Sequence, residues 1–545
     1  MRDFLAVLPL LAASLAGSHL VAQQLPPQPV PPQNPITPEK AILGKLLFWE
    51  EQMSSNNRVA CGTCHTFGAG GGDQRRVLFS AGPDGVTPSP DDTFGSPGIP
   101  HADANNDYVR DAAFGFGAQV TGRASPSFLT AAWFPELFWD GRARGNFVDP
   151  ETNQQTIPVG GALESQALGP ILAGSEMAHD NRLWSEVTTK LVSARPMALA
   201  TNLPADMAAA VANGVTYPDL FAAAFGSPAV TAQRIAYALA TYQRTLVPDQ
   251  SPYDQFQRGV PGAMTQQQVN GMNTFNGAAR CNLCHTPGLF SDRQFRNLGL
   301  QPVAADIGQQ GVTNNVADRG KFKVPSLRNA GLRTSFMHNG QFTSVGQVFG
   351  FYLNGGGPFQ DNKDPLLRPL QVPPQQANDL INFVTNALTD PRVAAGTGPF
   401  TRPTLASQRI PAAGFQYGIG SPGTGNRVPT ILSEVPANVG NVDFKVGVAN
   451  ARGGALATLA VSVFPATTQI QGVNVNVEVF QTPALFYTTL GGAAGVAGAG
   501  FGTVRFVLPP EPSLSGITLF SQWFVWDVGV PAGLCSSRGA ELRLF

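Results

Sequence analysis

Two copies of the pattern Cys-x-x-Cys-His are the residues of this chain whose types and spacing could do chemistry. The first copy is Cys61-Gly62-Thr63-Cys64-His65, and the second is Cys281-Asn282-Leu283-Cys284-His285. Two thiols one helical turn apart can add to the two vinyl groups of haem, while the adjacent imidazole reaches the iron from the same side. The pattern therefore predicts two covalently bound haem c groups, with His65 and His285 as iron ligands.

Other cysteine chemistry fits this pattern less well. One copy alone could be a redox dithiol or half of a zinc site, but zinc needs further Cys or His ligands at close spacing. Four histidines remain, at positions 19, 101, 179 and 338, and Cys535 is the fifth cysteine. We expect Cys535 to be a buried, inert thiol. Two complete copies therefore favour haem.

The elements that must position these motifs have helical signals. Before the first motif, Thr37 can cap a helix that begins at Pro38, and before the second, Thr265-Gln266-Gln267-Gln268 resembles a capping box. The repeated arrangement predicts two mainly α cytochrome c-type domains, residues 36–255 and 256–398. Apolar stripes support the helices: Leu43, Leu46 and Leu47; Val269, Met272 and Phe275; and, in a closing helix, Leu380, Ile381, Val384 and Leu388.

After about residue 400 the charge nearly vanishes and the period changes. Val473, Val475, Val477 and Val479 alternate with polar residues, and such alternation is typical of strands. Runs near 443–449, 456–464, 473–480, 503–508 and 517–528 predict an all-β, sandwich-like domain over residues 405–545. Its role is unknown from sequence. We expect a structural spacer, whose deletion would leave the haems unchanged.

The composition limits the partners and the location. The 545 residues carry a formal net charge of -1 and only 13% are charged, so nucleic acid and anionic lipid are not expected partners. Arg2, an apolar run over residues 4–16 and a small, polar end predict a signal peptide at 1–22, followed by a Pro/Gln linker at 23–35. No later apolar run reaches membrane-spanning length. We therefore expect a periplasmic or secreted protein without a membrane span.

Four further segments occur in a fixed order around the two motifs. They are Leu43-Gly44-Lys45-Leu46-Leu47-Phe48; Phe138-Trp139-Asp140-Gly141-Arg142-Ala143; Gln166-Ala167-Leu168-Gly169-Pro170, followed by Glu176-Met177; and Phe322-Lys323-Val324-Pro325-Ser326-Leu327-Arg328-Asn329, followed by Met337-His338-Asn339-Gly340. With these segments, residues 40–390 resemble the bacterial di-haem cytochrome c peroxidase and MauG family.

The resemblance implies roles for residues near the first haem. The haem on His65 would be the peroxidatic one, in a pocket lined by Gln166, Pro170 and Glu176. The Glu176 carboxylate would move the proton that cleavage of the peroxide O–O bond requires; the alternative is a solvated helix residue. Trp139 would lie between the haems and pass electrons, and the alternative is a core Trp.

Two departures from the peroxidase branch of the family bear on the resting state. That branch has a distal His in the loop before Arg123-Ala124-Ser125-Pro126, where this chain has Phe116 and no His between 102 and 178; His101 on a flexible loop stays open. We therefore expect a five-coordinate haem on His65, as in MauG. The second haem would have Tyr352 as sixth ligand instead of Met. Met337 is the rival ligand, and a packing role for Tyr352 is the other alternative.

The resemblance thus predicts an oxidoreductase that reduces hydrogen peroxide with electrons from a small donor protein, a cytochrome c or a cupredoxin. One alternative is MauG-like oxidation of a protein or organic substrate through high-valent haems. A non-enzyme alternative is a dihaem electron-transfer cytochrome. The resemblance also implies a possible homodimer. Members of the family often hold a calcium ion between the haems, and here that ion would rely on carbonyls near Lys323 and Pro325, because an Asn is replaced near Ala124. The run from Asp103 to Asp107 lacks the Gly and Glu of an EF-hand, so we expect a solvated loop there.

Overall fold

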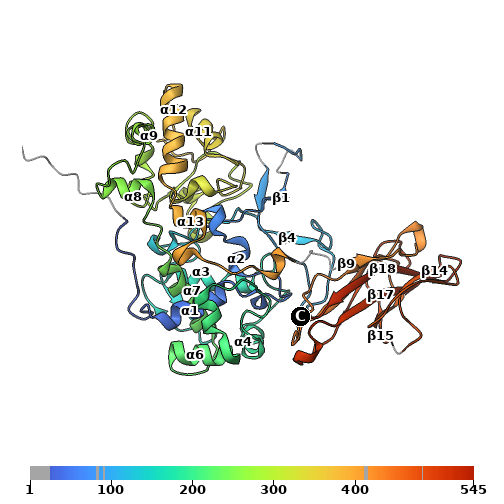
Figure 1. The fold of residues 1–545 in the computed structure, drawn as a ribbon. Coiled ribbons are helices and arrows are strands. Elements are labelled where there is room, and N and C mark those ends of the chain that lie inside the picture. Colours follow the sequence, from blue (N-terminus) through green and yellow to red (C-terminus); the bar gives the residue numbers. More distant parts are fainter. Residues whose placement is uncertain (1–24, 82–84, 90–91, 410–414, 482) are drawn as a thin grey trace, which may run out of the picture.

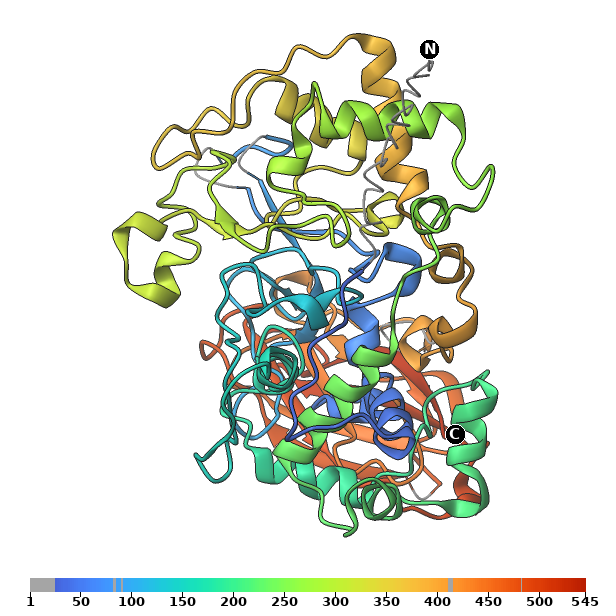
Figure 2. The same cartoon turned by 90° about the vertical axis from the view of Figure 1, so that its left-hand side faces the viewer.

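The computed structural model describes residues 25–81, 85–89, 92–409, 415–481 and 483–545. The predicted signal peptide, residues 1–22, lies outside them. A mainly helical part is followed by a β domain at its side, so that the molecule is elongated (Figure 1). The view turned by 90° has the helices in front and the red strands of the β domain behind the lower helices (Figure 2).

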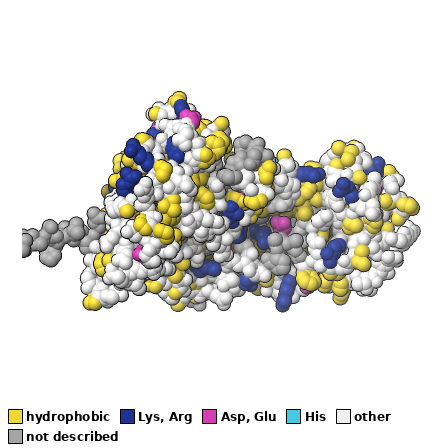
Figure 3. Space-filling view, turned by 90° about the horizontal axis from the view of Figure 1, so that it is seen from above, with side chains coloured by type: hydrophobic (Ala, Val, Ile, Leu, Met, Phe, Trp, Pro, Cys, Tyr) yellow, Lys and Arg dark blue, Asp and Glu magenta, His cyan; other side chains and the backbone are white. Residues whose placement is uncertain are grey.

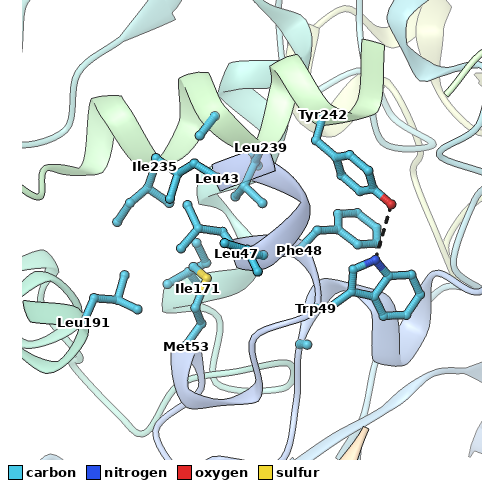
Figure 4. Close-up of a cluster of buried hydrophobic side chains, with 14 of the residues drawn as sticks. Leu43, Leu47, Phe48, Trp49, Met53, Ile171, Leu191, Ile235, Leu239 and Tyr242 are labelled. Carbon is cyan, nitrogen blue, oxygen red and sulfur yellow. Dashed lines mark hydrogen bonds between the residues drawn. The ribbon is translucent and has the colours of Figure 1, made fainter. Parts of the chain in front are cut away.

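The first helical core is built on α1 (Pro38–Phe48) and α7 (Ala232–Thr245). Thr37 caps α1 as predicted, because its side chain accepts from the Lys40 amide. The two helices meet at Gly44, where a Cβ would lie 1.9 Å from the Ala238 carbonyl oxygen. Leu43, Leu47, Trp49 and their neighbours fill the space between α1, α7 and the surrounding chain (Figure 4). The other helices here are α2 (Cys61–Cys64), α3 (Ala162–Leu168), α4 (Trp184–Ser193), α5 (Ala205–Ala210) and α6 (Tyr217–Phe225). The next helix, α8 (Pro252–Gln257), belongs to a second core, because its Tyr253 packs on Phe290 and Phe383.

A second core holds the second Cys-x-x-Cys-His motif. Its main helices are α9 (Gln266–Asn276), α11 (Val345–Leu353) and α12 (Pro374–Asn382), and a π-helical turn, Phe383–Ala387, extends α12. The capping box predicted at Thr265 is present. Phe275, Phe290 and Phe383 pack edge to face at its centre. Two short helices complete the helical part, α10 (Gln310–Thr313) and α13 (Pro391–Ala395).

The chain beyond α12 returns to the first core. Val393, Phe400 and Leu405 belong to the same buried cluster as α1 and α7. The backbone amides of Ala406 and Ser407 donate to the buried Glu51 carboxylate. The division of the helical part into two cytochrome c-type domains at residue 255 stays a prediction.

Four short antiparallel pairs cross the loops of the helical part. They are β1 (Val77–Ser80) with β2 (Thr93–Gly95), β3 (Pro97–Pro100) with β4 (Ala118–Val120), β5 (Phe147–Val148) with β6 (Gln155–Ile157), and β7 (Phe295–Arg296) with β8 (Phe322–Lys323).

The C-terminal β domain is confirmed. One sheet has the order β15-β12-β17-β18-β9 and another has the order β10-β11-β16, and one buried cluster joins both. Cys535 lies in this cluster, 1% exposed. The predicted runs correspond to β11 (Lys445–Ala451), β12 (Leu456–Ser462), β14 (Val473–Val477), β16 (Gly500–Arg505) and β17 (Thr518–Trp526). Five strands were not predicted: β9 (Phe415–Tyr417), β10 (Thr430–Leu432), β13 (Pro465–Ile470), β15 (Ala484–Thr489) and β18 (Leu534–Arg543).

The β domain is packed against the first helical core through polar contacts. Lys190 of α4 pairs with Asp443 at 2.6 Å, and Arg58 donates to the Glu434 carbonyl at 2.8 Å. The expectation of a solvated loop at 103–107 is wrong in part, because Asn106 is 6% exposed and accepts hydrogen bonds from Lys445. The β domain thus shares a partly buried ion pair with the first core, and its expected role as a spacer stays a prediction.

Across the residues that the structure describes, no helix combines the length and the apolar character needed to cross a membrane.

Candidate active site

The first motif lies at the wall of a cavity of about 570 Å³. Cys61 and Cys64 begin and end the single turn of α2, which packs so tightly that a Cβ on Gly62 would lie 2.2 Å from the Trp49 ring. His65 Nδ1 lies 3.0 Å from the Gly71 carbonyl oxygen. That contact orients the ring and leaves Nε2 available as a ligand. Burial lowers the pKa of His65, so the imidazole is neutral near pH 7.

The same cavity brings together the side chains that were predicted to act on peroxide. Gln166 of α3, Pro170, Glu176 and Trp139 all line it with His65. Glu176 is held in a tight turn in which the amides of Glu176, Met177 and Ala178 converge on the Ala173 carbonyl at 2.9–3.0 Å. Much of the remaining wall is apolar, including Phe48, Phe128 and Leu239. The arrangement could hold a small oxidant beside a carboxyl group.

The electrostatics of Glu176 suit proton transfer. Burial raises the pKa of Glu176 above its ordinary value, and the positive charge of Arg142 opposes this. The Arg142 guanidinium lies 3.6 Å from the centre of the Phe138 ring and 3.1 Å from the Asp140 carboxylate. A raised pKa brings a carboxyl group closer to neutral pH, where it can both take and return a proton.

The second motif lies beside a smaller cavity of about 230 Å³. His285 Nδ1 lies 2.9 Å from the Phe290 carbonyl oxygen, which again leaves Nε2 available. Tyr352 of α11 and Met337 both line this cavity, so both candidate ligands are near the motif. Burial raises the pKa of Tyr352, and the nearby thiols of Cys284 and Cys281 add to the effect.

A thin wall separates the two cavities. Pro126, Ser127, Trp139, Asp306 and Lys323 line both of them. The Trp139 indole is 7% exposed and donates from Nε1 to the Ala124 carbonyl at 2.8 Å. Trp139 therefore lies between the sites, where the resemblance places it, and its role in electron transfer stays a prediction.

The wall also contains charges that the sequence analysis missed. Arg123 bonds both oxygens of Asp306 at 2.7 Å and one oxygen of Asp140 at 2.5 Å. Burial lowers the pKa of Lys323 to about 7. Arg142 stood in one of the four segments that carried the resemblance, and Arg123 in the Arg123-Ala124-Ser125-Pro126 stretch, and this was the available signal for them.

Two residues of the loop before Arg123 do not reach the cavity at His65. The Phe116 ring packs against Phe501 of the β domain, 5.6 Å between centroids. His101 Nε2 lies 3.0 Å from Asp180 Oδ2. Neither lines the cavity at His65; within the described ranges, Phe79 of β1 does, and no imidazole lines it except that of His65.

The residues at both cavities fit haem c. Each cavity has two thiols and one oriented imidazole on one wall and apolar side chains around it. Arginines line both cavities, Arg123 and Arg142 the first, and Arg280, Arg296 and Arg368 the second.

Comparisons with known proteins define the family. The family model "Di-haem cytochrome c peroxidase" matches residues 38–261. Cytochrome-c peroxidase IdrP1 of Pseudomonas sp. (strain SCT) is 30% identical over 413 residues, which cover 70% of this chain and 89% of that protein. The methylamine utilization protein MauG of Methylorubrum extorquens (strain AM1) is 30% identical over 370 residues, 67% of this chain and 82% of that one. The chain therefore belongs to the di-haem cytochrome c peroxidase family and is an oxidoreductase of the cytochrome-c peroxidase type.

A solved structure agrees on the fold. It is a MauG-like protein associated with microbial copper homeostasis, 24% identical, with a TM-score of 0.50 over 69% of this chain and 96% of that chain. Family membership implies haem c cofactors, peroxide as substrate and cytochromes as electron donors.

Proposed function

We propose that this protein reduces hydrogen peroxide in the cavity at His65 and does so in the resting oxidised state, without prior reduction. The observation that carries the proposal is one cavity of about 570 Å³ that combines His65, Glu176 and Gln166. Electrons would arrive from the second cavity, where His285 and Tyr352 would hold the haem iron, through Trp139 in the shared wall. The reaction consumes one peroxide, two protons and two electrons and forms two water molecules.

The side chains have distinct tasks. A haem held by Cys61, Cys64 and His65 would supply the iron at which peroxide is reduced. Glu176 takes the proton from one oxygen of hydrogen peroxide and returns it to the other oxygen, which leaves as water. Two further protons and two electrons convert the remaining oxygen to the second water. Gln166 donates a hydrogen bond from its amide to the bound peroxide. Arg142 keeps the Glu176 pKa from rising further, because its positive charge favours the carboxylate.

The substitution Glu176→Gln tests this assignment. We expect the second-order rate constant for peroxide, measured by stopped-flow absorption, to fall about 100-fold, the lower range for loss of a general acid–base group. In the unmodified protein this rate should rise with pH through the Glu176 pKa, and the rise should vanish in the variant. Glu39→Gln, an exposed site in α1, is the control. A variant rate within threefold of the control would refute the proposal.

The docking site for the electron donor is proposed beside Cys281 and Leu283. Leu283 and Leu366 are 49% and 47% exposed at the second cavity, and the exposed Arg280 and Arg368 line the same cavity. Blue basic side chains are also prominent over the end of the molecule with α9, α11 and α12 (Figure 3). An apolar centre with a basic rim fits a small cytochrome or cupredoxin with an acidic surface.

Charge reversal tests the docking site. Arg280→Glu with Arg368→Glu should slow turnover with an acidic donor at least tenfold at low salt and should not slow turnover with a small organic reductant. Equal slowing with both reductants would contradict the site. The alternative function, oxidation of a protein or organic substrate, is tested by adding peroxide and such a substrate without the donor protein. Oxidation of the substrate in that assay would favour the alternative.

Calcium, dimer formation and export stay predictions from the family resemblance and the N-terminal sequence. Metal analysis of the purified protein tests the calcium ion. Analytical ultracentrifugation tests the dimer. N-terminal sequencing of the mature protein tests cleavage after residue 22.

A further inference from the structure

The β domain contacts the loop formed by residues 101–117, here called the 101–117 loop. Tyr108 of this loop is 3% exposed, and its amide donates to Thr503 Oγ1 of β16 at 2.9 Å. Lys445 of β11 donates to the Asn106 carbonyl at 2.6 Å and lies 4.2 Å from the Tyr108 ring centre. A Cβ on Gly447 would lie 2.6 Å from Tyr108 Cδ2, so β11 carries a glycine where the ring approaches it.

Alternate residues of β16 continue this interface. Phe501 packs on Phe116 with 5.6 Å between centroids, Thr503 accepts from Tyr108, and Arg505 pairs with Asp107 at 3.1 Å. Residues two apart on a strand share one face. One face of β16 therefore holds the 101–117 loop along its length.

The 101–117 loop joins β3 to β4, and this hairpin supports the turn that contains Glu176. Gln119 of β4 donates to the Gly174 carbonyl at 2.9 Å. Gly98 of β3 lies so close that a Cβ there would be 2.1 Å from the Ser175 carbonyl oxygen and 2.7 Å from Glu176 Cα. A displacement of the hairpin therefore changes the position of Glu176.

A second route reaches the same turn. Asp443 of the β domain pairs with Lys190, and Lys190 donates to the Ser54 carbonyl at 2.9 Å. The next residue, Ser55, donates from its amide to the Met177 carbonyl at 2.9 Å and accepts from the Asn106 side chain at 3.1 Å. Both routes thus start in the β domain and end within one residue of Glu176.

We propose that the C-terminal β domain holds Glu176 in place: β11 and β16 clamp the 101–117 loop, and the loop fixes the turn through the β3–β4 hairpin. Tyr108 and Thr503 are positioning residues for the peroxide reaction. The inference rests on the proposed role of Glu176 in proton transfer. It is an alternative to the expected spacer role. Support of Glu176 would matter for the rate, because a catalytic group displaced by about 1 Å can lose about 100-fold.

The test is Tyr108→Ala in the full chain. We expect the second-order rate constant for peroxide to fall about tenfold or more, as only part of the positioning is lost. The pH–rate inflection should move to lower pH, toward an ordinary carboxyl value, because water reaches Glu176. The reduction of the second haem by a small organic reductant should not change.

Matched variants separate positioning from a general loss of structure. Tyr108→Phe keeps the ring and removes a buried hydroxyl that has no hydrogen-bond partner, so it should restore the rate and the pH profile. The control is Tyr487→Ala. Tyr487 is 63% exposed on β15 of the β domain, so its replacement should have no effect. Phe501→Ala weakens the other end of the clamp and serves as the test if Tyr108→Ala does not fold.

The outcomes distinguish this inference from the proposed function. A slow Glu176→Gln variant together with a folded Tyr108→Ala variant of unchanged rate and pH profile would overturn the positioning inference alone. An unaffected Glu176→Gln variant would overturn the proposed function and the inference with it. Slowing in Tyr108→Ala or Phe501→Ala, with rescue in Tyr108→Phe and an unaltered second haem, supports the inference.

Discussion

The buried ion pair between Arg328 and Asp254 allows a quantitative prediction for the part of the chain around the second motif. Their side chains are 0% and 3% exposed, and two hydrogen bonds of 2.8 Å join them. Arg328 also donates to the Gly288 carbonyl at 2.7 Å, and Asp254 accepts from the Ser251 amide and hydroxyl. The pair therefore ties α8 to the chain that follows His285.

Replacing Asp254 with Asn should destabilise the protein by about 4 kcal/mol at pH 7. The amide has one acceptor oxygen instead of a carboxylate, and removal of one partner from a buried ion pair costs about 3–5 kcal/mol because the remaining charge is uncompensated. Burial raises the pKa of Asp254. The hydrogen bonds and charge of Arg328 lower it by more, so that the pKa lies below its ordinary value of 3.8. The contribution of a carboxylate with a lowered pKa is present above pH 3.8 and is lost as pH falls through the folded-state pKa, so the difference between the proteins should shrink in acid.

Urea unfolding measures this difference, followed by far-ultraviolet circular dichroism and by absorption of the haem at the second motif. The control is Asp361→Asn, which breaks an ion pair with Arg319 whose partners are 54% and 36% exposed. An exposed pair contributes less than about 1 kcal/mol. A free energy of unfolding for Asp254→Asn within 1 kcal/mol of the control would refute the argument that this pair holds the second core together.

Three further substitutions test the two cavities. Trp139→Phe removes the indole donor to the Ala124 carbonyl and should slow electron transfer between the haems. The rate is measured by stopped-flow absorption after addition of peroxide to reduced protein, and an unchanged rate would exclude the indole from the path. Tyr352→Met should raise the midpoint potential of the second haem in a redox titration, since Met raises and Tyr lowers the potential, whereas no shift would favour Met337 as the ligand. Arg142→Ala should move the pH–rate inflection of the peroxide reaction to higher pH, because the charge that lowers the Glu176 pKa is lost, and a shift to lower pH would contradict this.

Much of the helical fold was predictable because its signals are local. The caps at Thr37 and Thr265 lie next to the apolar stripes that they precede, and both helices begin where those caps predict. The strand β18 was missed for the opposite reason. Its buried positions include Ser536 and Ser537, whose hydroxyls bond backbone groups of other strands, so no apolar alternation marks it.

The candidate site was predictable only where the chain places its residues in one short pattern or in a family segment. Each Cys-x-x-Cys-His motif is contiguous, and Glu176 follows a segment that carried the resemblance. The support of the 101–117 loop by the β domain had no such signal. Lys445 and Asn106 are 339 positions apart, and Thr503 and Tyr108 are 395 positions apart. Neither periodicity nor a motif relates residues at such separations.

The charges in the wall between the cavities bear on the direction of electron flow. Arg123 is shared by two carboxylates, those of Asp140 and Asp306, and Asp140 also pairs with Arg142, so the four groups together carry no net charge. Lys323 adds only a partial positive charge near neutral pH, because burial lowers its pKa to about 7. An indole that gives up an electron becomes positively charged, and nearby negative charge stabilises that form more in a buried site than in water. The wall around Trp139 has no such excess of negative charge, so its charges do not set a direction, and electron transfer through the ring stays a prediction.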